Sequence, residues 1–353
     1  GFNCLDKYMR RICTLLTGLF ALCASMELKA QDPQFSQFYA APLYINPAFT
    51  GASQFTRFGV NYRSQWPNLD ASFETFSFYA DHFVEKYNSG IGLILTTDRQ
   101  GNQGLKSTSI GFSYAYQLQL SENLVFRPGI QYSLYNRSAD FLGLVFANQI
   151  DAISGAIDPT ITDPSVFGQD LRVNFGDLSV GGVFYSRNLF LGVAVQHITE
   201  PNQSLIDGDS PLPQRFTLHG GYKISIGRGP LRKDLTYTYA ERSITPVFQY
   251  KEQGPFSQLD IGAFIHLEPI NFGLQYRGLP FKKFENFPNN EALIFTLGVT
   301  TNNFNIGYSY DYTLSDLSID AGGAHEFSLA YILDFSKPQI TPRSRWRIPC
   351  PKN

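Results

Sequence analysis

Apolar and small polar residues alternate along most of the chain, and this alternation limits the possible folds more than any other feature of the sequence. In residues 57–63, Phe58, Val60 and Tyr62 fall on one face of an extended chain, while arginine, glycine and asparagine fall on the other. A period of two predicts β-strands with one apolar and one polar face. The same period returns in segment after segment up to residue 335, so the sequence predicts an all-β fold.

We count about fourteen segments with this pattern. They begin near Thr56, Ser72, Gly90, Leu105, Leu124, Asp177, Asn188, Arg215, Ser243, Gln258, Ile270, Glu291, Asn303 and Ala324. Each runs about 9 to 13 residues, the length that a tilted strand needs to cross a bilayer, whereas strands in soluble sheets are usually nearer 5 to 6 residues. Short connections alternate with long ones, such as residues 136–176 and 199–214. We therefore predict a single-chain antiparallel outer-membrane β-barrel of about fourteen strands over residues 55–335.

Composition agrees with a membrane barrel and excludes two other classes of protein. Only 16% of the 353 residues are charged and 15% are aromatic, so the chain has ample apolar surface to bury and is not predicted to be disordered. A formal net charge of -2 provides no basic surface for nucleic acid. The mean hydropathy of -0.16 is an average over alternating apolar and polar residues, so it does not distinguish a soluble β protein from a membrane barrel.

The first 30 residues are predicted to be an upstream extension followed by a Sec-type signal peptide. Two arginines precede an apolar run from Ile12 to Ala24, and Ala30 is the small residue before the predicted cleavage site. The run is too short to span a bilayer as a helix. Lipidation of Cys23 is the less favoured alternative, because Leu22 stands where a lipoprotein signal has a small residue.

The sequence predicts no enzyme, no cofactor and no metal site. Removal of the signal peptide leaves Cys350 as the one cysteine, which excludes an internal disulfide and a thiolate zinc site. His325 and Glu326 lack the second histidine of a zinc protease motif, and neighbours in a strand face opposite sides of the sheet. Asp81 and His82 could form half of a hydrolase dyad on the barrel rim, but no partner residue is identifiable.

Six basic residues are predicted to point into the barrel among glycine, serine, asparagine and glutamine. They are Arg57, Arg63, Arg127, Arg215, Lys223 and Arg277. The interior of a barrel of about fourteen strands is wider than wall side chains alone can fill. It is therefore a channel, a ligand cavity or a plugged lumen.

The last predicted strand has a marked apolar face, and a basic tail follows it. Phe327, Leu329 and Tyr331 share one side, and a closing strand of this kind resembles the signal by which outer-membrane barrels are inserted. The tail, residues 336–353, is rich in proline and basic residues and is predicted to lie in the periplasm. It is either a solvated terminus or a docking strip for a periplasmic partner.

The mature chain is predicted to begin with a turn-rich segment, residues 31–54, that does not fit a strand. Three prolines interrupt it, so we expect it to pack in or under the barrel mouth as a plug. Its sequence DPQFSQFYAAPLYINPAFTGA resembles the signature of the PorP/SprF family of type IX secretion membrane proteins. The similarity continues through NYRSQW at residues 61–66 and GGAHEFSL at residues 322–329, and it covers essentially residues 31–352.

The resemblance implies an outer-membrane barrel of Bacteroidota whose partners are the type IX secretion machinery and the lipid bilayer. Such a protein would assist the secretion or surface attachment of large adhesin-like cargo and, in gliding species, motility. The residues of the signature are expected to form the plug or to contact a partner. They are Gln34, Phe35, Gln37, Phe38, Tyr39, Asn46, Pro47, Gly51, His325 and Glu326.

Two other functions fit a barrel of this size. An outer-membrane channel or hydrophobic-solute transporter of the fatty-acid type is the alternative hypothesis, and a transporter would show an apolar pocket near the plug. An enzyme would show a clustered acid and base on one rim, which the sequence lacks. Secretion and anchoring is the leading hypothesis.

Overall fold

The described residues of the computed structural model form one antiparallel barrel with a short segment inside it. The structure describes residues 32–69, 72–101, 104–139, 149–150, 157–158, 171–206, 208–230, 239–284, 287–301, 303–314, 321–333 and 348–349. The predicted signal peptide and most of the predicted tail lie outside these residues. The unit considered below spans residues 33–353.

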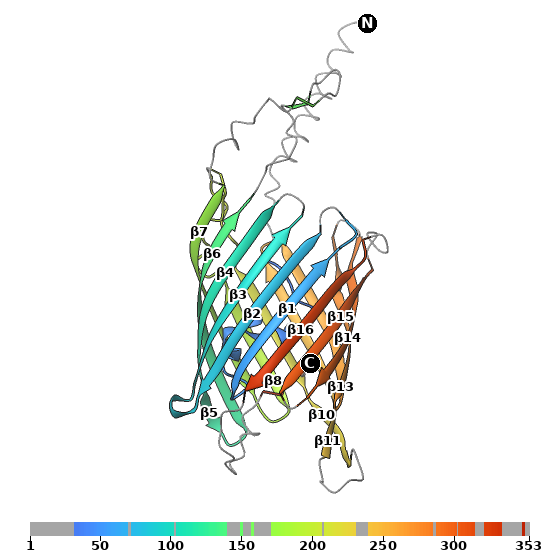
Figure 1. The fold of residues 1–353 in the computed structure, drawn as a ribbon. Helices are drawn as coiled ribbons and strands as arrows, with labels where there is room; N and C mark the ends of the chain where they lie inside the picture. The colour runs from blue at the N-terminus through green and yellow to red at the C-terminus, as the bar shows by residue number, and fades with distance from the viewer. Residues whose placement is uncertain are drawn as a thin grey trace, which may run out of the picture. The chain divides into compact units, whose positions relative to one another are not determined.

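Sixteen strands of the described residues pair into one sheet that closes on itself (Figure 1). They are β1 (Thr56–Gln65), β2 (Phe73–Val84), β3 (Ser89–Gln100), β4 (Leu105–Tyr116), β5 (Leu118–Ser121), β6 (Leu124–Ser138), β7 (Arg172–Tyr185), β8 (Leu189–Gln196), β9 (Arg215–Tyr222), β10 (Ile224–Pro230), β11 (Tyr239–Gln253), β12 (Phe256–Leu267), β13 (Ile270–Phe284), β14 (Phe287–Thr300), β15 (Phe304–Thr313) and β16 (Ala324–Leu333). β5 continues β4, since both pair with β6, and β10 continues β9, since both pair with β11. Sixteen strands less these two continuations leave fourteen positions around the barrel, with β16 paired to β1 and β9 to β11. The predicted antiparallel barrel is confirmed.

Side chains alternate between the inside and the outside of the wall. On β13, Phe272 and Leu274 are exposed on the outside, whereas Gln275 and Arg277 are buried on the inside. Large apolar residues line the outside of the other strands in the same way. Because pairing around a closed barrel satisfies the backbone N–H and C=O groups within the wall, this apolar outer face can lie in lipid.

Most connections at one end of the barrel are short, and the longest lie at the other end. The short-turn end carries η3 (Glu85–Tyr87) between β2 and β3, and the turns from β5 to β6 and from β7 to β8. The long-loop end carries residues 139–171 and 197–214. Barrels of this class keep short turns in the periplasm, so we assign the short-turn end to that side. β10 and β11 extend past the neighbouring strands at this end (Figure 1).

Three strands begin earlier than the alternation predicts. β7 begins at Arg172 rather than near Asp177, and β14 begins at Phe287 rather than near Glu291. β11 likewise begins at Tyr239, four residues before the predicted Ser243. These extensions lie at strand ends, where the wall leaves the lipid and pairing can continue without an apolar face.

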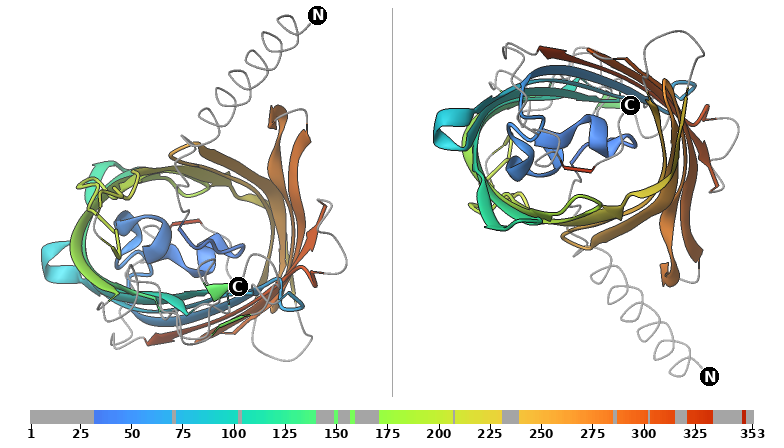
Figure 2. Two further views of the ribbon diagram at one scale, coloured as in Figure 1. Left: turned by 90° about the horizontal axis from the view of Figure 1, so that it is seen from above. Right: turned by 90° about the horizontal axis from the view of Figure 1, so that it is seen from below.

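Residues 33–55, here called the inner segment, lie inside the ring of strands (Figure 2). The segment contains η1 (Phe38–Ala40), α2 (Pro42–Ile45) and η2 (Pro47–Phe49). Proline opens both α2 and η2, where a missing N–H costs nothing because the first helical N–H groups have no partner. The side chain of Asn46 caps η2 by accepting a hydrogen bond from the Ala48 amide at 2.9 Å.

The two described residues of the predicted tail also lie inside the barrel. Ile348 packs against an apolar cluster made by the inner segment and the wall, and Pro349 is buried. Both lie beside the inner segment in the two views of Figure 2. The remainder of the tail, including Cys350, is outside the described residues.

Candidate functional site

The inner segment carries no charged side chain, although the wall around it carries many. Its polar groups are main-chain amides and carbonyls together with serine, threonine, asparagine, glutamine and tyrosine side chains. The segment therefore binds the wall as a neutral ligand would. The charges of the wall are paired with other wall residues or hydrogen-bonded to neutral oxygen atoms.

An ionic cluster in the wall surrounds the start of the inner segment. Its members are Arg63, Asp260, Arg277, Asp311 and Glu326, all of them buried. Arg277 lies 3.1 Å from Asp260 Oδ1 and 2.9 Å from Asp311 Oδ2. Arg63 lies 2.8 Å from Asp311 Oδ2 and 3.4 Å from Glu326 Oε2. Buried charges of opposite sign thus face each other across β1, β12, β13, β15 and β16, which is the condition for keeping them ionised away from water.

The Ser36 hydroxyl sits at the centre of this cluster. It donates to Asp311 Oδ2 at 2.6 Å, and it accepts from Arg63 Nη1 at 2.6 Å and from Arg277 Nη2 at 3.0 Å. A hydroxyl has one hydrogen to donate and two lone pairs, so the hydrogen-bonding capacity of Ser36 is fully used.

Glu326 binds the main chain of the inner segment directly. Its carboxylate accepts from the amide of Ser36 at 2.6 Å and from the amide of Gln37 at 3.0 Å. The Gln37 side chain donates to Ser309 Oγ at 3.2 Å and accepts from Ser328 Oγ at 2.7 Å. Hydrogen bonds to a charged acceptor are among the stronger ones, so this end of the segment is held by position-specific polar contacts.

A row of very small residues crosses the wall on the side opposite the ionic cluster. Gly90 pairs with Ala115, Ala115 with Gly129, Gly129 with Gly181, and Gly181 with Ala194. This small-residue row follows the cross-strand pairing over β3, β4, β6, β7 and β8. Larger side chains at these positions would fill the space that the inner segment occupies.

The main chain of the inner segment lies directly on the small-residue row. A Cβ atom on Gly129 would lie 2.4 Å from the Ala48 amide nitrogen, and one on Gly90 would lie 2.0 Å from the Thr50 carbonyl oxygen. Gly51 itself has φ of +70°, a conformation that a residue with a side chain adopts only with strain. A Cβ atom on Gly51 would also lie 2.7 Å from Gly90 Cα, so at this point of contact both residues are glycine.

Arg127, fully buried on β6, binds the carbonyls at the end of η2. Its Nε donates to the Ala48 oxygen at 3.2 Å, and an Nη atom donates to the Thr50 oxygen. Its other Nη donates to Gln117 Oε1 at 2.6 Å. Asp81 binds the following amide, since Gly51 N donates to its Oδ2 at 2.7 Å, and Arg57 pairs with Oδ1 of the same carboxylate at 2.9 Å.

Tyr44 and Asn46 fasten the middle of the segment to β7, β8 and β9. Arg215 lies 4.8 Å above the Tyr44 ring and donates to its hydroxyl at 3.1 Å. The Asn46 amide nitrogen donates to the carbonyl of Val193 at 3.0 Å and lies 3.1 Å from His219 Nε2. Asn46 therefore caps η2 with its oxygen and binds the wall with its nitrogen.

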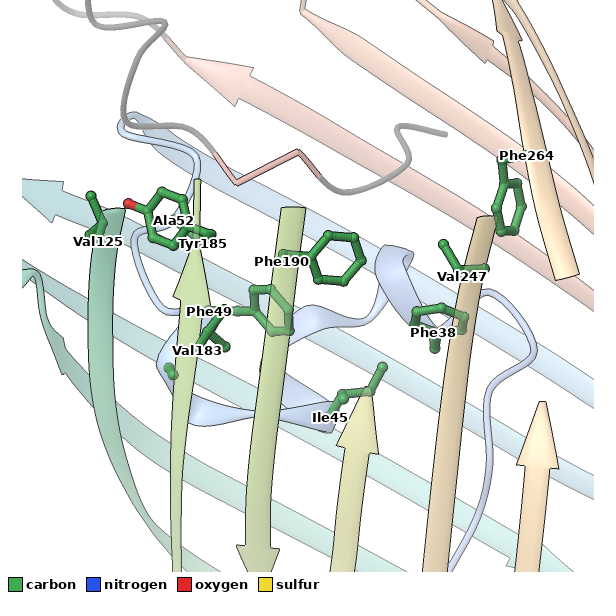
Figure 3. Close-up of a cluster of buried hydrophobic side chains, with 11 residues drawn as sticks. Phe38, Ile45, Phe49, Ala52, Val125, Val183, Tyr185, Phe190, Val247 and Phe264 are labelled. Carbon is green, nitrogen blue, oxygen red and sulfur yellow. The ribbon is translucent and has the colours of Figure 1, made fainter. Parts of the chain in front are cut away.

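An apolar cluster joins the segment to the inside of the wall (Figure 3). Phe49 lies between Val183 and Phe190, and Phe38 lies beside Val247. Burial also raises the pKa of the Tyr39 hydroxyl well above its usual value, so this group stays neutral inside the barrel. Several aromatic side chains of the wall point inward here, because the inner segment offers apolar surface to cover.

The predicted signature residues of the inner segment lie together within the barrel. Gln34 bonds to Glu291 Oε1 at 2.9 Å and receives a bond from Lys251 at 3.3 Å. Most of the others contact the ionic cluster, the small-residue row or the apolar cluster. These are Gln37, Phe38, Tyr39, Asn46, Pro47 and Gly51. Phe35 is buried and packs edge-on against the Tyr44 ring of the same segment. Whether they serve as a plug or as a partner contact remains a prediction.

The other predicted residues divide between the two faces of the wall. Glu326 points inward, whereas the neighbouring His325 contacts the Tyr308 hydroxyl, 2.8 Å away, on the opposite face of β16. Arg57, Arg63, Arg127, Arg215 and Arg277 all bond to groups inside the barrel. Lys223 is half-buried between β9 and β10.

The acid and base of the suggested rim dyad are separated by the wall. Asp81 is buried against Arg57, while His82 lies on the outer face and contacts the Thr56 hydroxyl. Within the described part of the chain, no three His, Cys, Asp or Glu side chains meet in a group suited to a metal ion. The described residues also contain no helix long and apolar enough to cross a bilayer.

Several residues that matter most in the site were not singled out in the sequence. Asp260 and Asp311 neutralise predicted inward arginines, and so does Asp81, which the sequence suggested only as half of a rim dyad. The alternation along each strand could have identified these acids, because each one occupies an inward-facing position of its own strand. The small-residue row has no comparable local signal, since its members become neighbours only through strand register.

Comparison with known proteins identifies the family. The model of the type IX secretion system membrane protein PorP/SprF family matches residues 27–331. The chain belongs to the PorP/SprF family. Together with the closed barrel and its apolar outer face, this membership makes the protein an outer-membrane β-barrel. No curated protein matches its sequence.

Solved structures with a similar backbone are outer-membrane barrels of low sequence identity. The Pseudomonas putida toluene transporter TodX is 9% identical over 82% of this chain and 93% of its own, with a TM-score of 0.49. A Pseudomonas aeruginosa FadL homologue is 12% identical over 82% of this chain and 93% of its own, with a TM-score of 0.40. The Acinetobacter baumannii outer membrane protein Omp33 is 7% identical over 79% of this chain and 99% of its own, with a TM-score of 0.43.

Proposed function

We propose that this protein is a plugged outer-membrane component of the type IX secretion system that assists the secretion or surface attachment of large adhesin-like cargo. In a gliding species the same role would serve motility. Its partners are then the secretion machinery in the periplasm and outer membrane and one or more secreted adhesins. We propose no catalytic role and no cofactor.

The observation that supports this proposal most directly is the seating of the inner segment. A conduit for solutes or for an unfolded chain needs a free lumen, but the segment binds the wall on the ionic side through Ser36 and on the opposite side through Ala48 and Thr50. Main-chain contact with the small-residue row leaves no layer of water between them. We infer that the barrel acts by holding partners rather than by conducting.

The transporter alternative predicts an apolar pocket beside the plug. The apolar wall residues inside the barrel instead pack against the inner segment itself, as Val247 does against Phe38 and Phe190 does against Phe49 (Figure 3). No observation here favours transport of a hydrophobic solute over secretion and anchoring.

Deletion of the gene tests the proposed function in cells. The outer membrane should remain intact, while one large surface protein should disappear from the cell surface, as measured by surface biotinylation and mass spectrometry. Persistence of every large surface protein in the deletion strain would contradict the proposal. Pull-down of the native protein should recover type IX components or the adhesin itself.

A further inference from the structure

The two ends of the inner segment are held by different chemistry. At the ionic cluster, each arginine faces a carboxylate of a neighbouring strand, so those charges stay paired when the segment is removed. At the small-residue row, Arg127 is fully buried, and no carboxylate of the described residues bonds to it directly. Asp81 acts on it electrostatically, but the oxygens of that carboxylate are bonded to Arg57 and to the Gly51 amide. Its nitrogens donate to two main-chain oxygens of the segment and to the neutral side chain of Gln117.

A buried guanidinium that bonds only to neutral acceptors is an incomplete ion pair. Burial of a charge is costly unless a partner of opposite sign or several hydrogen bonds compensate it. Here the carbonyls of Ala48 and Thr50 supply hydrogen-bond acceptors but no negative charge. A carboxylate at the same place would supply both, in the two-pronged geometry that arginine prefers.

The glycines around Arg127 contact mainly the main chain of the segment. Gly90, Gly129 and Gly181 face the backbone of the segment and the Asn46 amide, with no side chain of their own to select for a sequence. One end of the row lies near the short-turn end, since Gly90 is the second residue of β3, and Gly129 and Gly181 lie deeper in the barrel. A polypeptide that entered from the periplasm would reach the row from the Gly90 end, because Val125 and Tyr185 of the apolar cluster lie between the short-turn end and the deeper glycines.

We propose that the small-residue row and Arg127 form an exchangeable peptide site, which the inner segment occupies in the resting state and which a periplasmic polypeptide bearing a carboxylate takes over. The carboxylate replaces the Thr50 carbonyl on Arg127, and the incoming main chain replaces residues 46–50 on the row. The carboxylate is either a chain terminus or an acidic side chain. This inference rests on the proposed function, because it supplies the contact through which a partner or cargo would engage the barrel.

Peptide binding to the purified full-length protein tests the proposal. Ser36→Ala loosens the far end of the inner segment without touching the row. Three labelled heptapeptides are titrated against it in detergent, with fluorescence anisotropy as the readout. These are Tyr-Ile-Asn-Pro-Ala-Phe-Thr as the free acid, the same peptide as the amide, and an amide in which aspartate replaces the final threonine.

The free acid should bind about tenfold more tightly than the amide, since hydrogen bonds to charged groups exceed neutral ones by roughly that factor. Tight binding of the aspartyl amide would assign the site to an acidic side chain, and weak binding would assign it to a chain terminus. Adding Arg127→Gln should abolish the preference for the acid, whereas Arg99→Gln, an equal change of charge on the exposed far end of β3, should leave it intact.

Equal affinity for acid and amide, a preference that survives Arg127→Gln, or no binding of any peptide would each overturn the proposal. The outcome is independent of the cellular test. If the purified barrel binds the acid while the deletion strain keeps all its surface proteins, the peptide site stands and the secretion role fails. If the strain loses a surface protein but no peptide binds, the secretion role stands and the peptide site fails.

Discussion

Individual residues in this barrel are best understood by asking what the inner segment requires of them. From the sequence alone, an inward glycine is only one of the small residues that line the lumen. In the structure, Gly90 and Gly129 lie against the main chain of the inner segment, and Gly181 lies against Asn46. The inward arginines were predictable from alternation. Their partners Asp260 and Asp311 were not, because the sequence does not show which strands close next to each other.

Gly129→Ala tests the contact between the row and the segment. The added methyl group would lie 2.4 Å from the Ala48 amide nitrogen, so the segment must shift. Overpacking of this kind should lower the free energy of unfolding, measured by urea titration in lipid vesicles, by about 1 to 3 kcal/mol. It should also raise ion conductance in planar bilayers.

Gly182→Ala is the matched control for this variant. Gly182 lies on the outer face beside the row, and its methyl group would meet the Phe126 ring at 2.9 Å. That ring borders lipid and can turn aside, so both stability and conductance should stay near the wild-type values. Equal effects of Gly129→Ala and Gly182→Ala would contradict the seating described here.

Asp311→Asn tests the ionic cluster. Asparagine keeps the shape of the side chain but leaves Arg63 and Arg277 sharing one negative charge fewer, and it weakens the bond from Ser36. Loss of one partner from a buried ionic network should reduce the free energy of unfolding by about 3 kcal/mol. Tyr312→Phe, on the outer face of the same strand, should change it by less than about 0.5 kcal/mol.

At the scale of elements, the strands follow from local sequence and their ends do not. Alternation is a property of a few consecutive residues, so the beginnings of β1, β4, β6 and β13 coincide with the predictions. The earlier beginnings of β7, β11 and β14 arise where pairing continues beyond lipid and alternation is no longer required. The helical turns of the inner segment follow from Pro42, Pro47 and the Asn46 cap, but their docking surface does not.

The lipid exposure of the strands can be tested with one matched pair of substitutions. Ile261 on β12 and Ile206 in the connection between β8 and β9 have nearly equal exposure, 52% and 53%. Ile261→Arg should cost about 2 to 4 kcal/mol when the barrel is folded into vesicles, because the charge enters the hydrocarbon region. Ile206→Arg should cost about 0.5 kcal/mol or less, since it stays in water. Equal costs would contradict the placement of the outer face in lipid.

The whole molecule combines a barrel that the sequence predicts with an interior that it only suggests. Period-two alternation leads to a closed antiparallel barrel, and three prolines lead to a segment that is not a strand. The small-residue row and the ionic cluster both depend on how the strands are paired around the closed barrel, which no local sequence pattern contains. The position of Ile348 against the apolar cluster is a long-range contact of the same kind.

The central claim is that the inner segment closes the barrel, and single-channel recording in planar bilayers tests it most directly. Purified wild-type protein should show no steady conductance, while a variant that lacks residues 34–50 should show stepwise, long-lived openings. The folded state of both should be checked beforehand by the shift in gel mobility on heating. Steady, porin-like conductance of the wild-type protein, unchanged by the deletion, would contradict the account.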